Sequence, residues 1–173
     1  MKKILLLFTA LGALTLSSCS NDDDNVAVVG SDTVATVVET PALTFTSAGD
    51  YQILVEFDQT YPQYDSALVY RRIFDSSANV NAWQLIPRTI FLDNGDEVDY
   101  DYNFTQSDLI LLLGANFPLN EIPSDLTTNQ VFRIVMIPGS LNGQAKAAKV
   151  DFKDYNAVIK HYGINDGTVK VLK

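Results

Sequence analysis

The sequence predicts a mainly β protein, an antiparallel β-sandwich with one short helix near the C-terminus. Three observations support this fold class. Apolar and polar residues alternate with a period of two in several segments after residue 42, which is the pattern of half-buried strands. Turn-forming pairs such as Asn94-Gly95 and Pro138-Gly139 separate these segments, and only one stretch has convincing helical spacing.

Five segments carry the strand pattern. Residues 51–57 alternate between an apolar and a mixed face, and residues 97–104 place aromatic side chains on one face and acidic or amide side chains on the other. Residues 68–74 have apolar side chains on both faces, and so do residues 130–137 except at Arg133, which predicts central strands. Residues 108–113 are a short apolar run that ends at a glycine, and this favours a buried strand over a helix.

Asn94-Gly95 predicts a hairpin, because this pair is preferred in a two-residue type I′ turn. Such a turn would place Asp93 opposite Asp96, Phe91 opposite Val98 and Arg88 opposite Asp101. The same register would bring three further side chains to the face of the aromatic row, namely Trp83, Leu85 and Phe91. Pro87 has no N–H to donate to a sheet, so we expect it at an edge or a bulge.

Residues 152–162 carry the helical pattern, with apolar residues three and four positions apart. Asp151 or Asp154 can cap its start, and Gly163 ends it. A last strand over 168–172 follows the Asp166-Gly167 turn. About seven or eight short strands with one helix predict a sandwich that is immunoglobulin-like in general architecture.

The first 18 residues have the pattern of a secretory signal peptide. Two lysines precede an uncharged apolar run from Ile4 to Leu16, which is shorter than the roughly 20 residues that cross a bilayer. We therefore expect a signal peptide over 1–18, a flexible tether over 19–41 and a single β-sandwich domain over 42–173. Within the tether, the Val- and Thr-rich residues 25–40 leave two alternatives, a disordered linker or an additional strand.

The end of the signal peptide carries a specific motif. Leu16-Ser17-Ser18-Cys19 resembles the bacterial lipobox, in which the cysteine thiol receives diacylglycerol and the chain is cut just before it. This resemblance implies that Cys19 is the lipidation site and that the chain contacts the membrane through this anchor, since two or more acyl chains hold a protein durably. Cys19 is the single cysteine of the chain, so an intramolecular disulfide is excluded.

The acidic run behind the cysteine indicates where the lipoprotein goes. Asp22, Asp23 and Asp24 resemble the export signal of Bacteroidota surface lipoproteins, which implies an outer-membrane lipoprotein exposed on the cell surface. Ser20 stands where enterobacterial lipoproteins retained at the inner membrane carry an aspartate. The alternative is that the three aspartates only keep a linker solvated.

The formal net charge of −9 limits the classes of partner. A strongly acidic chain repels nucleic acid and anionic lipid, so we expect neither as an electrostatic partner. Residues 146–173 are the exception, with six lysines against three aspartates. We expect this tail to fold back on the acidic body; the alternative is a small basic contact patch.

The catalytic and metal-binding signals are few. His161 is the single histidine, which excludes a site of several histidines, and its place near the end of the predicted helix favours a role as a capping cation. We predict no catalytic residues and no cofactor apart from a calcium candidate. This candidate is the acidic turn with Asp93, Asp96 and Glu97, where facing carboxylates would repel one another unless a cation binds; solvated turn residues are the alternative.

Two tripeptides, Asp32-Thr33-Val34 and Asp65-Ser66-Ala67, resemble the Bacteroidota O-glycosylation pattern of aspartate, then serine or threonine, then a small apolar residue. They make Thr33 and Ser66 candidate glycosylation sites. If Thr33 is modified, we expect a stiffer and more protease-resistant tether.

The body of the chain resembles the C-terminal β-domain of small flavobacterial lipoproteins. The segments that carry this resemblance are Tyr70-Arg71, residues 83–87, the Asn94-Gly95 turn, residues 102–105 and residues 129–138. Some members carry a collagen-like stretch, which this chain lacks. We expect a surface-anchored, non-catalytic binding or envelope-structural module with an unknown protein or glycan partner. The alternative is a calcium-dependent carbohydrate-binding or glycan-processing lipoprotein.

Overall fold

The computed structural model describes residues 35–63, 65–139 and 150–173. These residues form a mainly β fold of two open sheets, which confirms the predicted β-sandwich. One sheet has the strand order β4 (Val80–Ile86), β3 (Ser66–Asp75), β8 (Phe132–Ile137), β1 (Thr36–Glu39) and β9 (Lys170–Val171). The other has the order β2 (Gln52–Glu56), β7 (Asp108–Ala115), β6 (Glu97–Phe104) and β5 (Arg88–Phe91).

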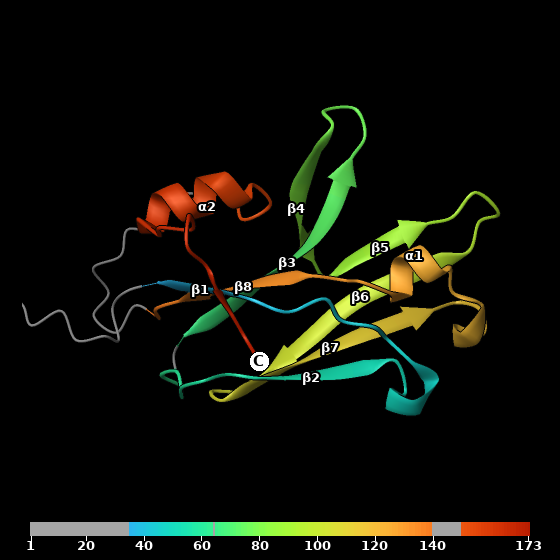
Figure 1. Cartoon of the computed structure of the whole chain (residues 1–173), viewed down its shortest axis with the longest axis horizontal. Helices are drawn as coiled ribbons and strands as arrows, with labels where there is room; N and C mark the ends of the chain where they lie inside the picture. Colours follow the sequence, from blue (N-terminus) through green and yellow to red (C-terminus); the bar gives the residue numbers. More distant parts are fainter. Residues whose placement is uncertain (1–34, 64, 140–149) are drawn as a thin grey trace, which may run out of the picture.

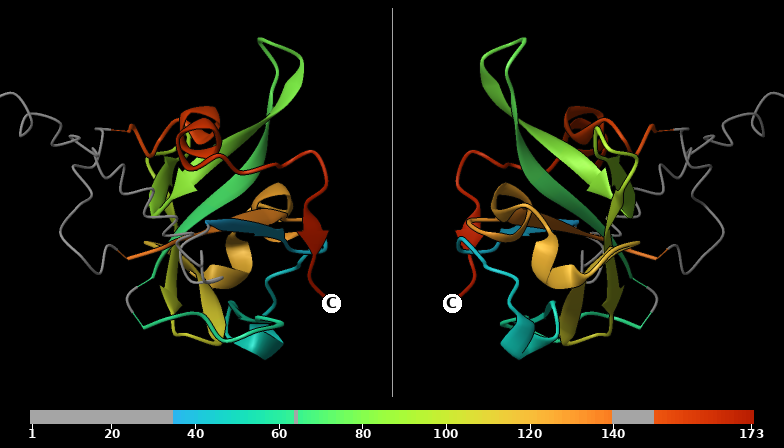
Figure 2. Two further views of the ribbon diagram at one scale, coloured as in Figure 1. Left: turned by 90° about the vertical axis from the view of Figure 1, so that its left-hand side faces the viewer. Right: turned by 90° about the vertical axis from the view of Figure 1, so that its right-hand side faces the viewer.

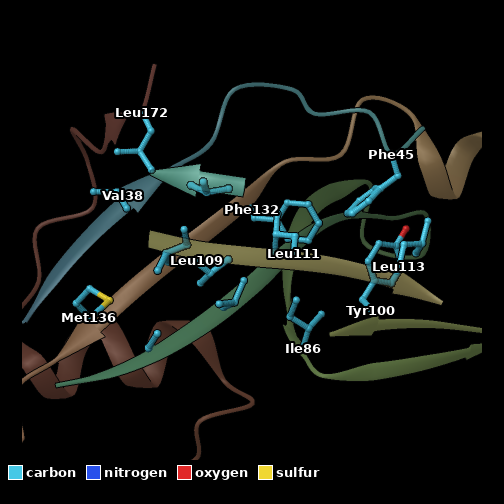
Figure 3. Close-up of a cluster of buried hydrophobic side chains, with 14 of the residues drawn as sticks. Val38, Phe45, Ile86, Tyr100, Leu109, Leu111, Leu113, Phe132, Met136 and Leu172 are labelled. Atoms are coloured by element: carbon cyan, nitrogen blue, oxygen red, sulfur yellow. The ribbon is translucent and has the colours of Figure 1, made fainter. Parts of the chain in front are cut away.

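The two sheets pack face to face around the main core (Figures 1 and 3). The described strands pair antiparallel except β1 and β9, which run parallel. Every second side chain along a strand points into this core, because successive side chains of a strand point to opposite faces of the sheet. The fully buried members include Val69, Ile86, Val98, Leu109, Phe132 and Ile134.

A second core lies on the outer face of the five-stranded sheet, beneath helix α2 (Tyr155–Tyr162). Tyr70 and Val135 project into it from β3 and β8, whereas their neighbours Val69 and Ile134 project into the main core. This explains why both strands are apolar on both faces. The prediction that they are central strands is confirmed.

Helix α2 begins and ends at residues that the sequence identifies. The Asp154 carboxylate accepts a hydrogen bond from the Ala157 N–H at 3.1 Å, so Asp154 rather than Asp151 is the N-cap. Gly163 adopts φ 63° at the C-terminal end, where a side chain would be strained. His161 lies exposed in the last turn. Short helical turns at Ser47–Gly49, Leu119–Glu121 and α1 (Ser124–Thr127) were not predicted.

The predicted register of the β5–β6 hairpin is wrong by one residue. Phe91 lies opposite Glu97 and Arg88 opposite Tyr100, not opposite Val98 and Asp101. The loop has three residues, because Leu92 accepts a hydrogen bond from the Gly95 N–H at 3.0 Å and donates one to Asp96 O at 2.8 Å. Gly95, with φ 87°, is the bulge residue that follows such a turn.

The shifted register changes which side chains are buried. Ile90 and Leu92 now pack against the main core, and Phe91 is 73% exposed. Trp83 and Leu85 belong to the second core instead of lying with the aromatic row of β6. Pro87 lies between β4 and β5, the edge strands of the two sheets, as predicted.

The predicted boundary between tether and domain also needs correction. Residues 36–39, placed in the flexible tether by the sequence, form β1 between β8 and β9. The physical reason is that the β-branched run buries Val38 in the main core and pairs with two neighbouring strands. Of the two alternatives for residues 25–40, the additional strand is therefore observed for 36–39.

The basic tail folds back on the body over its described residues. Helix α2 covers the five-stranded sheet (Figure 1), and β9 pairs with β1. Lys170 Nζ lies 2.5 Å from Asp58 Oδ2, although both side chains are largely exposed. An exposed ion pair of this kind contributes little to stability, so the apolar contacts of α2 hold the tail.

Candidate binding grooves beside the β3–β4 hairpin

The predicted lipidation site, the export signal and the first candidate glycosylation site lie outside the described residues; they are Cys19, the run of Asp22, Asp23 and Asp24, and Thr33. Ser66 is exposed at the first position of β3, opposite Ile137. Its neighbour Asp65 accepts a hydrogen bond from the Gly139 N–H at 3.2 Å, which fixes the start of the strand and leaves the Ser66 hydroxyl accessible.

The acidic turn does not have the geometry that suggested calcium. Asp96 lies opposite Leu92 rather than Asp93, and its carboxylate accepts a hydrogen bond from Asn94 Nδ2 at 2.6 Å. The main-chain N–H of Glu97 donates to Asn116 Oδ1 at 2.9 Å. Within residues 35–63, 65–139 and 150–173, no group of three or more His, Cys, Asp or Glu side chains is arranged to hold a metal ion.

The β3–β4 hairpin projects beyond the rest of the described fold (Figures 1 and 2). Asp75 stabilises its tip, because its carboxylate accepts hydrogen bonds from the Ser77 hydroxyl at 2.6 Å and from two main-chain N–H groups. These hydrogen bonds hold the pKa of Asp75 below its usual value. Phe74 and Val80 beside the tip are 63% and 51% exposed.

One groove runs along the β4 edge, where the chain passes from one sheet to the other, and we call it the Trp83 groove. It has a volume of about 660 Å³ and joins β4 and β5 to the segment before α2. Its walls combine aromatic residues with cations in a chain that is otherwise acidic. The lining residues that matter here are Trp83, Phe91, Arg88 and Lys153.

A second groove, the Arg71 groove, lies between the hairpin and the turn that carries α1. Its volume is about 400 Å³, and Ile73 lines both grooves. Arg71 is 7% exposed, and its guanidinium carbon lies 4.4 Å from the centre of the Tyr100 ring. Burial lowers the pKa of Arg71 from its ordinary value, although contact with Tyr100 and the charge of Asp125 oppose this change.

Gln130 holds the Arg71 side chain in place. Its Oε1 accepts a hydrogen bond from Arg71 Nε at 2.7 Å, and its Nε2 donates to the main-chain oxygens of Asp125 and Thr128 at 2.8 and 2.6 Å. The Tyr100 hydroxyl donates to Leu126 O, and burial raises the pKa of Tyr100 to about 12. The phenol is therefore neutral at physiological pH and gives Arg71 no counter-charge.

Arg133, on β8, has the opposite environment. Its guanidinium donates to Glu39 Oε2 at 2.8 Å, to Asp166 Oδ2 at 2.9 Å and to the Tyr155 hydroxyl at 2.6 Å. It also stacks on Trp83, with 4.3 Å from Cζ to the ring centre. Burial alone would lower the pKa of Arg133, but the hydrogen bonds to Glu39 and Tyr155 raise it above the ordinary value. This network joins four elements and is structural.

Neither groove was predicted from the sequence. The available signal was a charged residue in a strand whose alternation predicts burial, which applies to Arg71 and Arg133 alike. The sequence alone does not distinguish a paired arginine from an unpaired one, since the partners of Arg133 lie 94 and 33 residues away.

Comparisons with known proteins give no assignment: no family model matches the chain, and neither the curated proteins nor the solved structures contain a significant match. Among the described residues, no helix has the length and apolar character needed to cross a membrane.

Proposed function

We propose that this protein is a surface-anchored lipoprotein whose β-sandwich is a non-catalytic binding module, and that its partner docks in the Trp83 groove. The anchor rests on the lipobox resemblance at Cys19 and the acidic run of Asp22, Asp23 and Asp24. The binding role rests on one observation, the exposed aromatic and cationic lining of the groove at the junction of the two sheets.

The lining selects for a partner with negative charge and a flat or apolar group. Phe91 offers a ring that is 73% exposed, beside the exposed cations Arg88 and Lys153. Aromatic and arginine side chains are the residue types that dominate binding energies at interfaces. In a chain with net charge −9, a local cationic surface also directs an anionic partner to this groove.

The calcium-dependent alternative has less support. Its basis was the acidic turn of Asp93, Asp96 and Glu97, in which the described geometry brings no set of ligands together. We therefore propose no calcium-dependent activity.

The test is crosslinking on intact cells with a membrane-impermeant reagent. The Phe91→Ser and Arg88→Ser double variant should lose most of the adduct that the wild-type chain forms, because both side chains are exposed in the groove. The matched control, Leu54→Ser with Lys160→Ser, removes an exposed apolar residue and a cation elsewhere and should keep the adduct. An adduct that survives in the groove variant would contradict the binding site.

The anchor is tested in the same cells. Cys19→Ser removes the thiol that accepts the lipid, so the chain should leave the membrane fraction. A Cys19→Ser chain that stays in the membrane fraction would contradict lipid anchoring.

A further inference from the structure

We propose that the Arg71 groove is a binding site for an acidic saccharide and that the Arg71 guanidinium recognises the carboxylate of a uronic acid unit. The inference deepens the proposed function, since it names a ligand group for the same binding module, at a site separate from the Trp83 groove.

Arg71 is not paired with any carboxylate of the described residues, and only the more distant charge of Asp125 acts on it. No carboxylate of the described residues lies within 4.0 Å of its guanidinium, whereas Arg133 on the neighbouring strand has two. Burying an arginine without a paired carboxylate is costly, and the cost amounts to several kcal/mol when the site excludes water. An unpaired buried cation beside a groove is therefore better explained by an external anion than by stability.

The guanidinium of Arg71 is held in one orientation. Arg71 Nε already donates a hydrogen bond to Gln130 Oε1, and one face of the guanidinium lies on the Tyr100 ring. The fixed side chain leaves the two terminal nitrogens, whose parallel N–H groups match the two oxygens of a carboxylate. Gln130 is itself held by two main-chain oxygens, so the donor is oriented before a ligand arrives.

The charged residues of the groove lining are two arginines, Arg71 and Arg72, and one aspartate, Asp125, so the lining has one positive charge in excess, which suits a monoanion such as a carboxylate. Asp125 is exposed on the wall of the same groove, and its negative charge would repel a phosphate dianion more than a monoanion. Arg72 is exposed and is a second cation of the lining, and the remaining polar lining residues are neutral and carry amide or hydroxyl groups: Asn81, Thr128, Asn129 and Gln130.

The neutral lining residues and the Phe74 ring indicate the chemistry of the uncharged part of the ligand. Neutral donors and acceptors of this kind suit sugar hydroxyls, and the exposed Phe74 ring supplies an apolar surface at the rim. The groove volume of about 400 Å³ falls in the range of small-molecule sites. These features together favour a uronic acid over the carboxylate end of a peptide.

The experiment is titration calorimetry on the purified chain with glucuronate, and with glucose as the neutral probe at equal ionic strength. We expect saturable binding of glucuronate and none of glucose. Arg71→Lys keeps the charge but loses the planar pair of donors and should weaken binding by about tenfold or more. Asp125→Asn, an exposed substitution that removes the repelling charge, should strengthen it.

Three results would overturn the inference: glucose binding as well as glucuronate, unchanged glucuronate binding in a folded Arg71→Met variant, or Arg71-dependent binding of N-acetylglycine but not of glucuronate. Unchanged affinity in Asp125→Asn would also contradict the electrostatic argument. The Phe91→Ser and Arg88→Ser variant should bind glucuronate normally, because neither residue lines the Arg71 groove. If glucuronate does not bind to the Arg71 groove, the crosslinking test of the Trp83 groove is unaffected, because the two experiments probe different residues.

Discussion

Arg71 and Arg133 lie on adjacent strands, and the pairing of β3 with β8 explains why their surroundings differ. Arg133 is the cross-strand partner of Tyr70, and Arg71 is the partner of Phe132. Paired residues share a face of the sheet, so these two pairs project to opposite faces. Arg133 meets carboxylates from β1 and from the segment after α2, whereas Arg71 meets Tyr100 and Gln130.

Removing Arg133 should destabilise the fold because its loss leaves Glu39 and Asp166 without a cation. The Arg133 side chain is 16% exposed and that of Asp166 is 33% exposed, so we expect Arg133→Met to lower the free energy of unfolding by about 2 to 3 kcal/mol, somewhat less than for a fully buried pair. Urea denaturation measures this change. Arg72→Met, at an exposed neighbouring position, should stay within about 0.5 kcal/mol of the wild type.

The network also predicts a rescue. Replacing Glu39 with Gln and Asp166 with Asn in the Arg133→Met chain removes the two unpaired charges and should recover part of the lost stability. If the triple variant is less stable than Arg133→Met alone, the charges are not the source of the loss.

At the scale of elements, the β5–β6 hairpin shows that a turn sequence predicts the position of a hairpin but not the register of its strands. Asn94-Gly95 fits a two-residue turn and also a three-residue turn with glycine in the bulge position. The choice depends on burial: the observed register places Ile90 and Leu92 against the main core and exposes Phe91. The burial of Ile90 and Leu92 depends on contacts with segments distant in the sequence, so the register cannot be predicted from the turn sequence alone.

Gly95→Ala tests the observed turn. Gly95 has φ 87°, and an added methyl group would meet no atom within 4 Å, so the cost comes from the backbone alone. We expect a loss of about 1 to 2 kcal/mol in chemical denaturation. Gly114→Ala in β7 is the matched control, since its nearest contact is Asp99 Cβ at 4.0 Å and its φ is not positive. Equal stability of the two variants would argue against the bulged turn.

Strands were predictable from the sequence where their apolar pattern lies within one short segment. Residues 68–74, 97–104 and 108–113 lie in strands, and so do 132–137 of the predicted 130–137, because period-two alternation and double-sided apolar runs depend directly on burial. The short α1 was not predictable, since four residues carry too little periodicity. The two grooves were not predictable either, because each is built from segments that come together only in the folded sandwich.

At the scale of the whole molecule, β1 joins the two ends of the described chain. It lies between β8 and β9, so the last strand has no other neighbour in the sheet. Thr40 follows β1, and its hydroxyl accepts a hydrogen bond from the Phe132 N–H at 3.0 Å. Glu39 holds Arg133, and Val38 packs in the main core beside Leu172 (Figure 3).

The start of the folded module can therefore be located by truncation. A chain of residues 42–173 lacks β1, and we expect it to be less stable than a chain of residues 35–173 by at least about 3 kcal/mol, from the lost burial of Val38 and the lost hydrogen bonds of Glu39 and Thr40. Chemical denaturation of both chains gives the difference. In the longer chain, Val38→Ala should lower the midpoint while Val171→Ala, at a 53% exposed position, should not. Equal midpoints for the two truncated chains would instead favour a domain that begins at residue 42, with β1 contributing nothing to its stability.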